Sequence, residues 1–255
     1  MARDLGHVLH LFAPELAAPG DADVAPGGDP ARMPDAEGTL PLIGVPLARP
    51  DAVRMALLDN VAVEAGRHGA HVALLAPRAL FGAAGEDAAA PFGVESRRID
   101  AGPAALVQGA EEALRRAPPR ATAMVFAAYP ASWLQKGADV AALLRWSLVF
   151  VRPDAASLRE ASDVLETIAA QAPGARLGVS VYGVRTLVEA RDCFEHLALG
   201  IERRLGCALT SYGVLVDDVH VSRSIVTGRP VGLSNPHTPS ARAFADVARL
   251  LLGDV

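Results

Sequence analysis

The segment from Leu40 to Pro77 contains the residues that could carry phosphate chemistry. Leu40–Val45 is an apolar run of strand length, Asp51–His68 has helical spacing, and His71–Ala76 is a second apolar run. A loop between a strand and the N-terminus of a helix is a common site for phosphate groups in α/β proteins. Residues 48–55 occupy that position here.

The side chains of this loop do not suit a triphosphate. No glycine lies between Ala48 and Val53, although glycines let successive backbone N–H groups approach phosphate oxygens. Pro50 has no N–H, and Asp51 brings a carboxylate to the helix N-terminus, where the phosphates would lie. The pattern therefore predicts the geometry of a phosphate loop without its chemistry.

Composition excludes several classes of function. The chain has 255 residues, is 51% hydrophobic and has a net charge of -5, so it lacks the basic footprint of a nucleic-acid-binding protein. Lys136 is the single lysine among the 24 basic residues. The two cysteines, Cys193 and Cys207, are expected to be reduced thiols, without a disulfide or a metal site. No apolar run reaches the ~18 residues that span a bilayer, so a cytoplasmic chain without membrane insertion is predicted.

Two regions differ in pattern. Residues 1–39 are predicted to contain a short amphipathic helix, with Leu5, Val8, Leu9 and Phe12 on one face, followed by a flexible linker. This helix is either a docking peptide or a loosely packed terminus, and both interpretations stay open. Residues 40–255 are predicted to form one α/β domain.

Strands and helices alternate through the domain, which predicts a doubly wound, mostly parallel sheet with helices on both faces. The further strands are predicted at Val94–Ile99, Thr122–Ala128, Ser147–Val151, Leu177–Val184 and Ala208–Val216. The further helices are predicted at Ala104–Arg116, Ala138–Arg145, Asp154–Ala170, Leu187–Leu205, Val219–Val226 and Ser240–Leu252.

Four motifs in the C-terminal half occur in an order that resembles one family. They are Val149–Leu158 (VFVRPDAASL), Tyr182–Phe194 (YGVRTLVEARDCF), Leu205–Pro230 (LGCALTSYGVLVDDVHVSRSIVTGRP) and Ser234–Leu252 (SNPHTPSARAFADVARLLL). Together they resemble the MinD/ParA group of deviant Walker ATPases, and within it the FlhG branch, which controls flagellar number. The resemblance implies a P-loop NTPase-like fold, with ATP and Mg²⁺ as the family's cofactors.

The family's active-site residues are mostly replaced at the matching positions. Asn60 matches an asparagine that follows the signature lysine by about six residues, which puts Arg54 at the position of that lysine and Met55 at that of the Mg²⁺-binding Ser or Thr. Ala127 and Ala128 stand where the resemblance implies an acidic residue, and Tyr182 where it implies a base-binding Asn.

These replacements predict a degenerate, catalytically inactive member. The loop residues Arg49, Pro50, Asp51, Arg54, Met55 and Asn60 are then vestigial, with no catalytic residue, bound cofactor or metal. The alternative is an ATPase with a non-standard loop, in which Arg54 or Lys136 contacts the phosphates of ATP·Mg²⁺.

The resemblance also implies protein partners. In FlhG-like proteins an N-terminal helix stimulates an SRP-type GTPase, and residues 1–12 occupy the corresponding position. The predicted function is therefore a regulator or scaffold that binds another protein in the placement or assembly of a flagellum or other polar machine. Family members dimerise around two nucleotides through the signature lysine, so without it we expect a monomer or a constitutive homodimer.

Overall fold

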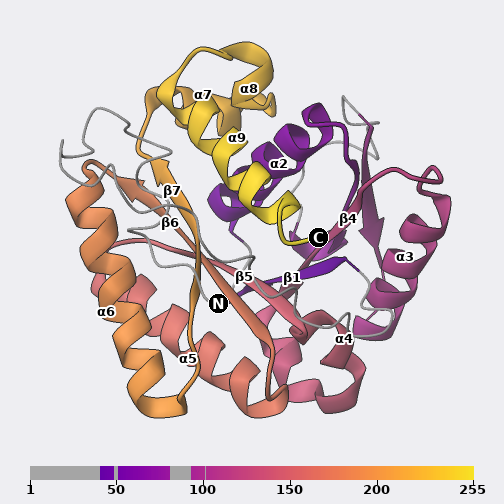
Figure 1. Cartoon of the computed structure of the whole chain (residues 1–255). Coiled ribbons are helices and arrows are strands. Elements are labelled where there is room, and N and C mark those ends of the chain that lie inside the picture. Colours follow the sequence, from indigo (N-terminus) through magenta and orange to yellow (C-terminus); the bar gives the residue numbers. More distant parts are fainter. Residues whose placement is uncertain (1–40, 49–50, 81–92, 101) are drawn as a thin grey trace, which may run out of the picture.

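The parallel sheet is the centre of the molecule (Figure 1). The computed structural model describes residues 41–48, 51–80, 93–100 and 102–255. Seven strands form one sheet in the order β3-β2-β4-β1-β5-β6-β7, and every neighbouring pair is parallel. The strands are β1 (Leu42–Leu47), β2 (His71–Pro77), β3 (Val94–Ile99), β4 (Ala123–Pro130), β5 (Trp146–Val151), β6 (Arg176–Val184) and β7 (Thr210–Val216).

Helices cover both faces of this sheet, as the sequence predicts. One face carries α2 (Ala52–Arg67), α7 (Val219–Thr227), α8 (Val231–Ser234) and α9 (Pro239–Leu252). The other carries α3 (Pro103–Arg116), the 3₁₀ segment η3 (Ala131–Val140), α4 (Ala141–Leu144), α5 (Ala155–Gln171) and α6 (Leu187–Leu205), while the short 3₁₀ turn η2 (Arg78–Leu80) follows β2. Central strands buried on both faces explain why β1 and β4 are apolar runs and why β5 is apolar except for the buried Ser147.

The helix ends follow local chemistry that is readable in the sequence. Asp154 caps the N-terminus of α5, and its carboxylate accepts hydrogen bonds from two backbone N–H groups. Gly206 and Gly228 end α6 and α7 in the left-handed conformation, with φ of 65° and 62°. The thiols of Cys193 and Cys207 are free, and burial raises the pKa of Cys193 to about 11.

Two predicted elements need correction, and one helix was not predicted. The helix predicted at Ala138–Arg145 is instead the end of η3 followed by the single turn of α4, and the non-helical backbone of Gly137, with φ 62°, lies just before this segment. Strand β4 continues past Ala128 to Pro130, since Tyr129 is fully buried and pairs with Pro46 of β1. The four-residue helix α8 was not predicted, because so short a segment carries no periodicity.

Close packing of helices on the sheet limits side-chain size at β1. A Cβ on Gly44 would lie 2.1 Å from the carbonyl oxygen of Leu143 in α4, so only glycine fits there. Among the described residues, no helix is both long and apolar enough to cross a membrane.

Candidate functional site

The topology brings the loops after β1 and β5 together at one edge of the sheet. These strands are neighbours, but the chain leaves β1 toward β2 on one side of the sheet and leaves β5 toward β6 on the other. Such a point, where the direction of winding reverses, opens a crevice outside the carboxyl ends of the strands, where ligands of α/β proteins bind. We call this site the switch-point crevice.

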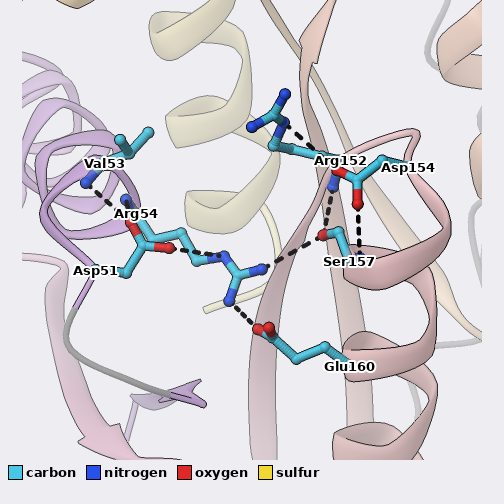
Figure 2. Close-up of polar contacts among 7 residues, drawn as sticks. All are labelled: Asp51, Val53, Arg54, Arg152, Asp154, Ser157 and Glu160. Carbon is cyan, nitrogen blue, oxygen red and sulfur yellow. Dashed lines mark hydrogen bonds and ion pairs between the residues drawn. The ribbon is translucent and has the colours of Figure 1, made fainter.

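The N-termini of α2 and α5 flank the crevice, and an aspartate side chain caps each of them (Figure 2). Asp51 Oδ1 accepts hydrogen bonds from the backbone N–H groups of Val53 and Arg54, both at 3.0 Å. Asp154 Oδ1 accepts from Ala156 N at 3.1 Å and Ser157 N at 2.9 Å. A bound phosphate at either helix would need these same N–H groups, so each cap competes with an anion for its donors.

Arg54 crosses the crevice from α2 to α5 (Figure 2). Its guanidinium forms a hydrogen-bonded ion pair with Glu160, lies 3.4 Å from Ser157 Oγ and has its Nε 3.6 Å from Asp51 Oδ2. Ser157 Oγ also accepts a hydrogen bond from the backbone N–H of Arg152 at 2.9 Å. The side chain of Arg54 is only 8% exposed, so this cation is committed to the protein's own groups.

Carboxylates that line the crevice balance the positive charge of Arg54. Burial alone would lower the pKa of Arg54, but the hydrogen bond to Glu160 and the nearby charges raise it above its ordinary value, so the guanidinium stays charged. The same charge opposes the rise that burial produces in the pKa of Tyr182. Three carboxylates, of Asp51, Asp154 and Glu160, face two guanidiniums, of Arg54 and Arg152, which leaves one negative charge in excess.

A cavity of about 600 Å³ remains between these groups, and its size is in the range of small-molecule sites. The donor set does not fit a triphosphate, because the helix N–H groups are used by Asp51 and Asp154 and the net charge is negative. Among the residues that the structure describes, no cluster of three or more His, Cys, Asp or Glu side chains could hold a metal ion.

The predicted site residues separate in the fold. Asp51, Arg54 and Tyr182 line the crevice, whereas Met55 packs into the core between α2 and the sheet. Asn60 is buried away from the cavity, where its amide donates to Ala56 O and accepts from Val231 N.

Other predicted residues lie elsewhere. Lys136 lies 5.3 Å from the ring of Trp133 and does not line the crevice. Ala127 and Ala128 are internal to β4, and the strand ends at Tyr129 and Pro130, where no carboxylate is present either. Six predicted residues lie outside the described part of the chain: Leu5, Val8, Leu9, Phe12, Arg49 and Pro50.

Sequence reasoning missed the contribution of α5 to this site. Arg152, Asp154, Ser157 and Glu160 all line the crevice, but they lie a hundred residues from the loop after β1. One signal could have found them: the tetrapeptide Arg-Pro-Asp-Ala occurs at 49–52 and again at 152–155. In the sequence, each copy comes after a buried strand, β1 or β5, and before a helix capped by its aspartate, α2 or α5. The repeat therefore marks two strand-to-helix connections of the same kind.

Fold and crevice together define an α/β protein with the P-loop NTPase-like architecture of MinD and ParA ATPases. The MinC:MinD cell division complex of Aquifex aeolicus gives a TM-score of 0.62 at 16% identity over 84% of this chain and 96% of that one. A ParA family ATPase from Chlorobium tepidum gives 0.56 at 14% identity, covering 82% and 96%. MinD from Pyrococcus horikoshii, solved with Mg-ADP, gives 0.56 at 13% identity, covering 82% and 94%.

Comparisons by sequence found no match. No protein-family model matches the chain, and no curated protein matches it. The shared property is therefore the fold, and the activity has to be argued from the crevice.

Proposed function

We propose that the chain is a MinD/FlhG-like regulator that works by binding another protein in the cytoplasm and does not hydrolyse ATP. The observation that carries the proposal is Arg54 held between Asp51, Ser157 and Glu160 in the switch-point crevice. In this arrangement a protein cation, balanced by protein carboxylates, occupies the space between two helix N-termini, where an ATPase of this fold would need free anion donors. The vestigial loop then has a structural role.

A titration with ATP·Mg²⁺ tests this proposal. A ligand at a hundredfold excess over its Kd stabilises the folded state by about 2.7 kcal/mol, equivalent to a rise in Tm of roughly 5–10 °C for a chain of this size. We expect no such rise for the wild-type chain at millimolar ATP. A clear rise that Arg54→Ala removes would establish the second candidate, an ATPase with a non-standard loop.

That second candidate rests on one observation, the cavity of about 600 Å³ between Arg54 and Arg152. A variant that keeps the hydrogen bonds of the crevice but lowers its negative charge tests whether this charge excludes phosphate from the cavity. Asp51→Asn combined with Glu160→Gln retains an N-cap of equal strength and a hydrogen-bond acceptor for Arg54, but removes two carboxylates. We expect this variant to gain weak ATP-dependent stabilisation that the wild-type chain lacks.

The partner-binding element of the proposal is the N-terminal segment, whose apolar positions are Leu5, Val8, Leu9 and Phe12. An apolar helix at the end of a linker docks into a groove through such positions. The partner proposed from the family resemblance is an SRP-type GTPase or another component of a flagellar or polar machine. The solved MinC:MinD complex shows one protein of this fold bound to a partner protein.

Deleting residues 1–12 should abolish pull-down of the SRP-type GTPase without changing the Tm of the domain. Leu5→Asp with Leu9→Asp should have the same effect, whereas His7→Gln with His10→Gln changes the polar face and should retain binding. Undiminished pull-down by the deletion variant would rule out this segment as the docking peptide.

A further inference from the structure

The segment formed by α7 and α8, residues 219–235, differs in charge from the rest of the chain. It contains Arg223, Arg229 and His220 but no aspartate or glutamate, in a protein whose net charge is -5. We call it the α7–α8 lobe. It lies on the same face of the sheet as α2 and α9 (Figure 1).

A cavity of about 290 Å³ lies between the two helices of this lobe. Gly228, with φ 62°, ends α7 and reverses the chain, so the residues after it face the last two turns of that helix. The polar lining of the cavity includes His220, Arg223 and Ser224 of α7 as well as Arg229, Ser234 and Asn235.

The wall formed by α8 is fixed to α2. Val231 N donates a 2.7 Å hydrogen bond to Asn60 Oδ1, and Arg67 donates a 3.1 Å hydrogen bond to the carbonyl oxygen of Gly232. The backbone of α8 packs so closely on α2 that a Cβ on Gly232 would lie 1.6 Å from Glu64 Oε1. This wall is therefore fixed by its contacts with α2, and binding a ligand there does not require ordering of the wall.

The cationic groups of the cavity are available to a ligand. The guanidinium groups of Arg223 and Arg229 form no hydrogen bond or ion pair with another described residue, and both residues are exposed. Nδ1 of His220 is buried without a hydrogen-bond partner, and such atoms in folded proteins usually have a water or ion as partner. The nearby carboxylate of Asp218 is already used by His220 N at 2.9 Å and Ser240 Oγ at 2.7 Å.

We propose that this cavity binds one phosphate group, either free phosphate or the monoester of a small metabolite. Two guanidiniums offer the planar, paired N–H donors that match phosphate oxygens, and the amide of Asn235 adds a neutral donor. The volume is at the lower limit of ligand sites, which suits a small anion better than a nucleotide. The site is separate from the switch-point crevice, with which it shares no lining residue.

The test is a ¹⁵N-¹H NMR titration of the full chain with inorganic phosphate at constant ionic strength, with a parallel titration by glycerol 3-phosphate. We expect saturable chemical-shift changes in the amides of residues 220–235. Saturation at a lower concentration of glycerol 3-phosphate than of inorganic phosphate would identify the ligand as a monoester, and the reverse order would identify it as free phosphate. Arg223→Gln with Arg229→Gln should weaken binding about tenfold or more, because two charge-assisted hydrogen bonds are lost.

Arg115→Gln with Arg203→Gln is the matched control, since it removes two exposed arginines from the opposite face and should leave binding unchanged. Three outcomes would overturn the proposal: no saturation by either phosphate, equal weakening in the control, or shifts confined to the crevice residues 51–54 and 154–160. Binding of a short DNA duplex through Arg223 and Arg229, without saturation by phosphate, would also overturn it and assign the lobe to nucleic acid.

Discussion

Arg54 has an environment that differs from that of an ordinary surface arginine on a helix. Its guanidinium is almost fully buried and joins residues of two helices, and removal of such a group leaves its partners without a counter-charge. Glu160 retains partial access to solvent, so part of that cost is relieved by water. The contact therefore connects the two sides of the crevice as well as neutralising it.

Asp59 of α2 gives the clearest pH-dependent prediction. Burial raises the pKa of this carboxyl to about 6 from its ordinary value of 3.8, and no other described residue forms an ion pair or hydrogen bond with it. Between these two pKa values the folded state binds the proton more tightly than the unfolded state does. Stability should therefore rise as the pH falls from about 7 toward 4, as far as this group is concerned.

Replacing Asp59 by Asn should remove this dependence. At pH 7.5 we expect Asp59→Asn to raise the free energy of unfolding by about 1–3 kcal/mol, and at pH 4 to change it little. Urea denaturation at both pH values measures the difference. Asp163→Asn on the exposed side of α5 is the matched control, and an equal effect of the two substitutions would contradict the assignment.

At the scale of elements, α8 depends on α2 for its position. Four residues are too few for a stable helix on their own, and the contacts of Asn60 and Arg67 supply what local propensity does not. Asn60, which the family resemblance marks as part of the phosphate-loop pattern, thus has an observable structural role. Its side chain fixes the start of α8 while bonding its own helix at Ala56 O.

Asn60→Ala should destabilise the chain by about 1–3 kcal/mol, because it leaves the buried N–H of Val231 without a partner. Amide hydrogen exchange should show lost protection at residues 231–235, while the central strands β1 and β4 keep theirs. Gln108→Ala, an exposed amide on α3, should change stability by less than about 0.5 kcal/mol. Unchanged protection of α8 in Asn60→Ala would show that the tether is not needed.

At the scale of the whole molecule, the oligomeric state should not respond to ATP. If the chain does not bind ATP, as proposed, then ATP cannot control its dimerisation. We therefore expect either a monomer or a constitutive homodimer. Multi-angle light scattering should give the same mass with and without ATP·Mg²⁺. A mass that doubles only when ATP is added would favour the ATPase alternative. The Asp51→Asn, Glu160→Gln variant measured in parallel would show whether relieving the negative charge restores a response.

Local patterns in the amino-acid sequence are enough to predict the layers of this protein. Apolar runs of strand length, helical spacing between them and local caps such as Asp154 and Gly206 depend on neighbours within a few residues, so they are readable without a structure. The same local reasoning identified Asp51 as a carboxylate at a helix N-terminus. It failed at residues 138–145, where the chain forms the end of η3 and one turn of α4, and at α8, which has no periodicity of its own.

The groups that face the loop after β1 come from distant parts of the chain, so they are known from the three-dimensional fold. Arg54 and Glu160 are separated by 106 positions in the sequence, and their contact exists because β1 and β5 are neighbours in the sheet. Strand order is set by packing of the whole domain, so no local pattern specifies it. The opposed aspartate caps, the bridge across the crevice and the cationic cavity between α7 and α8 all result from that order and from packing on α2.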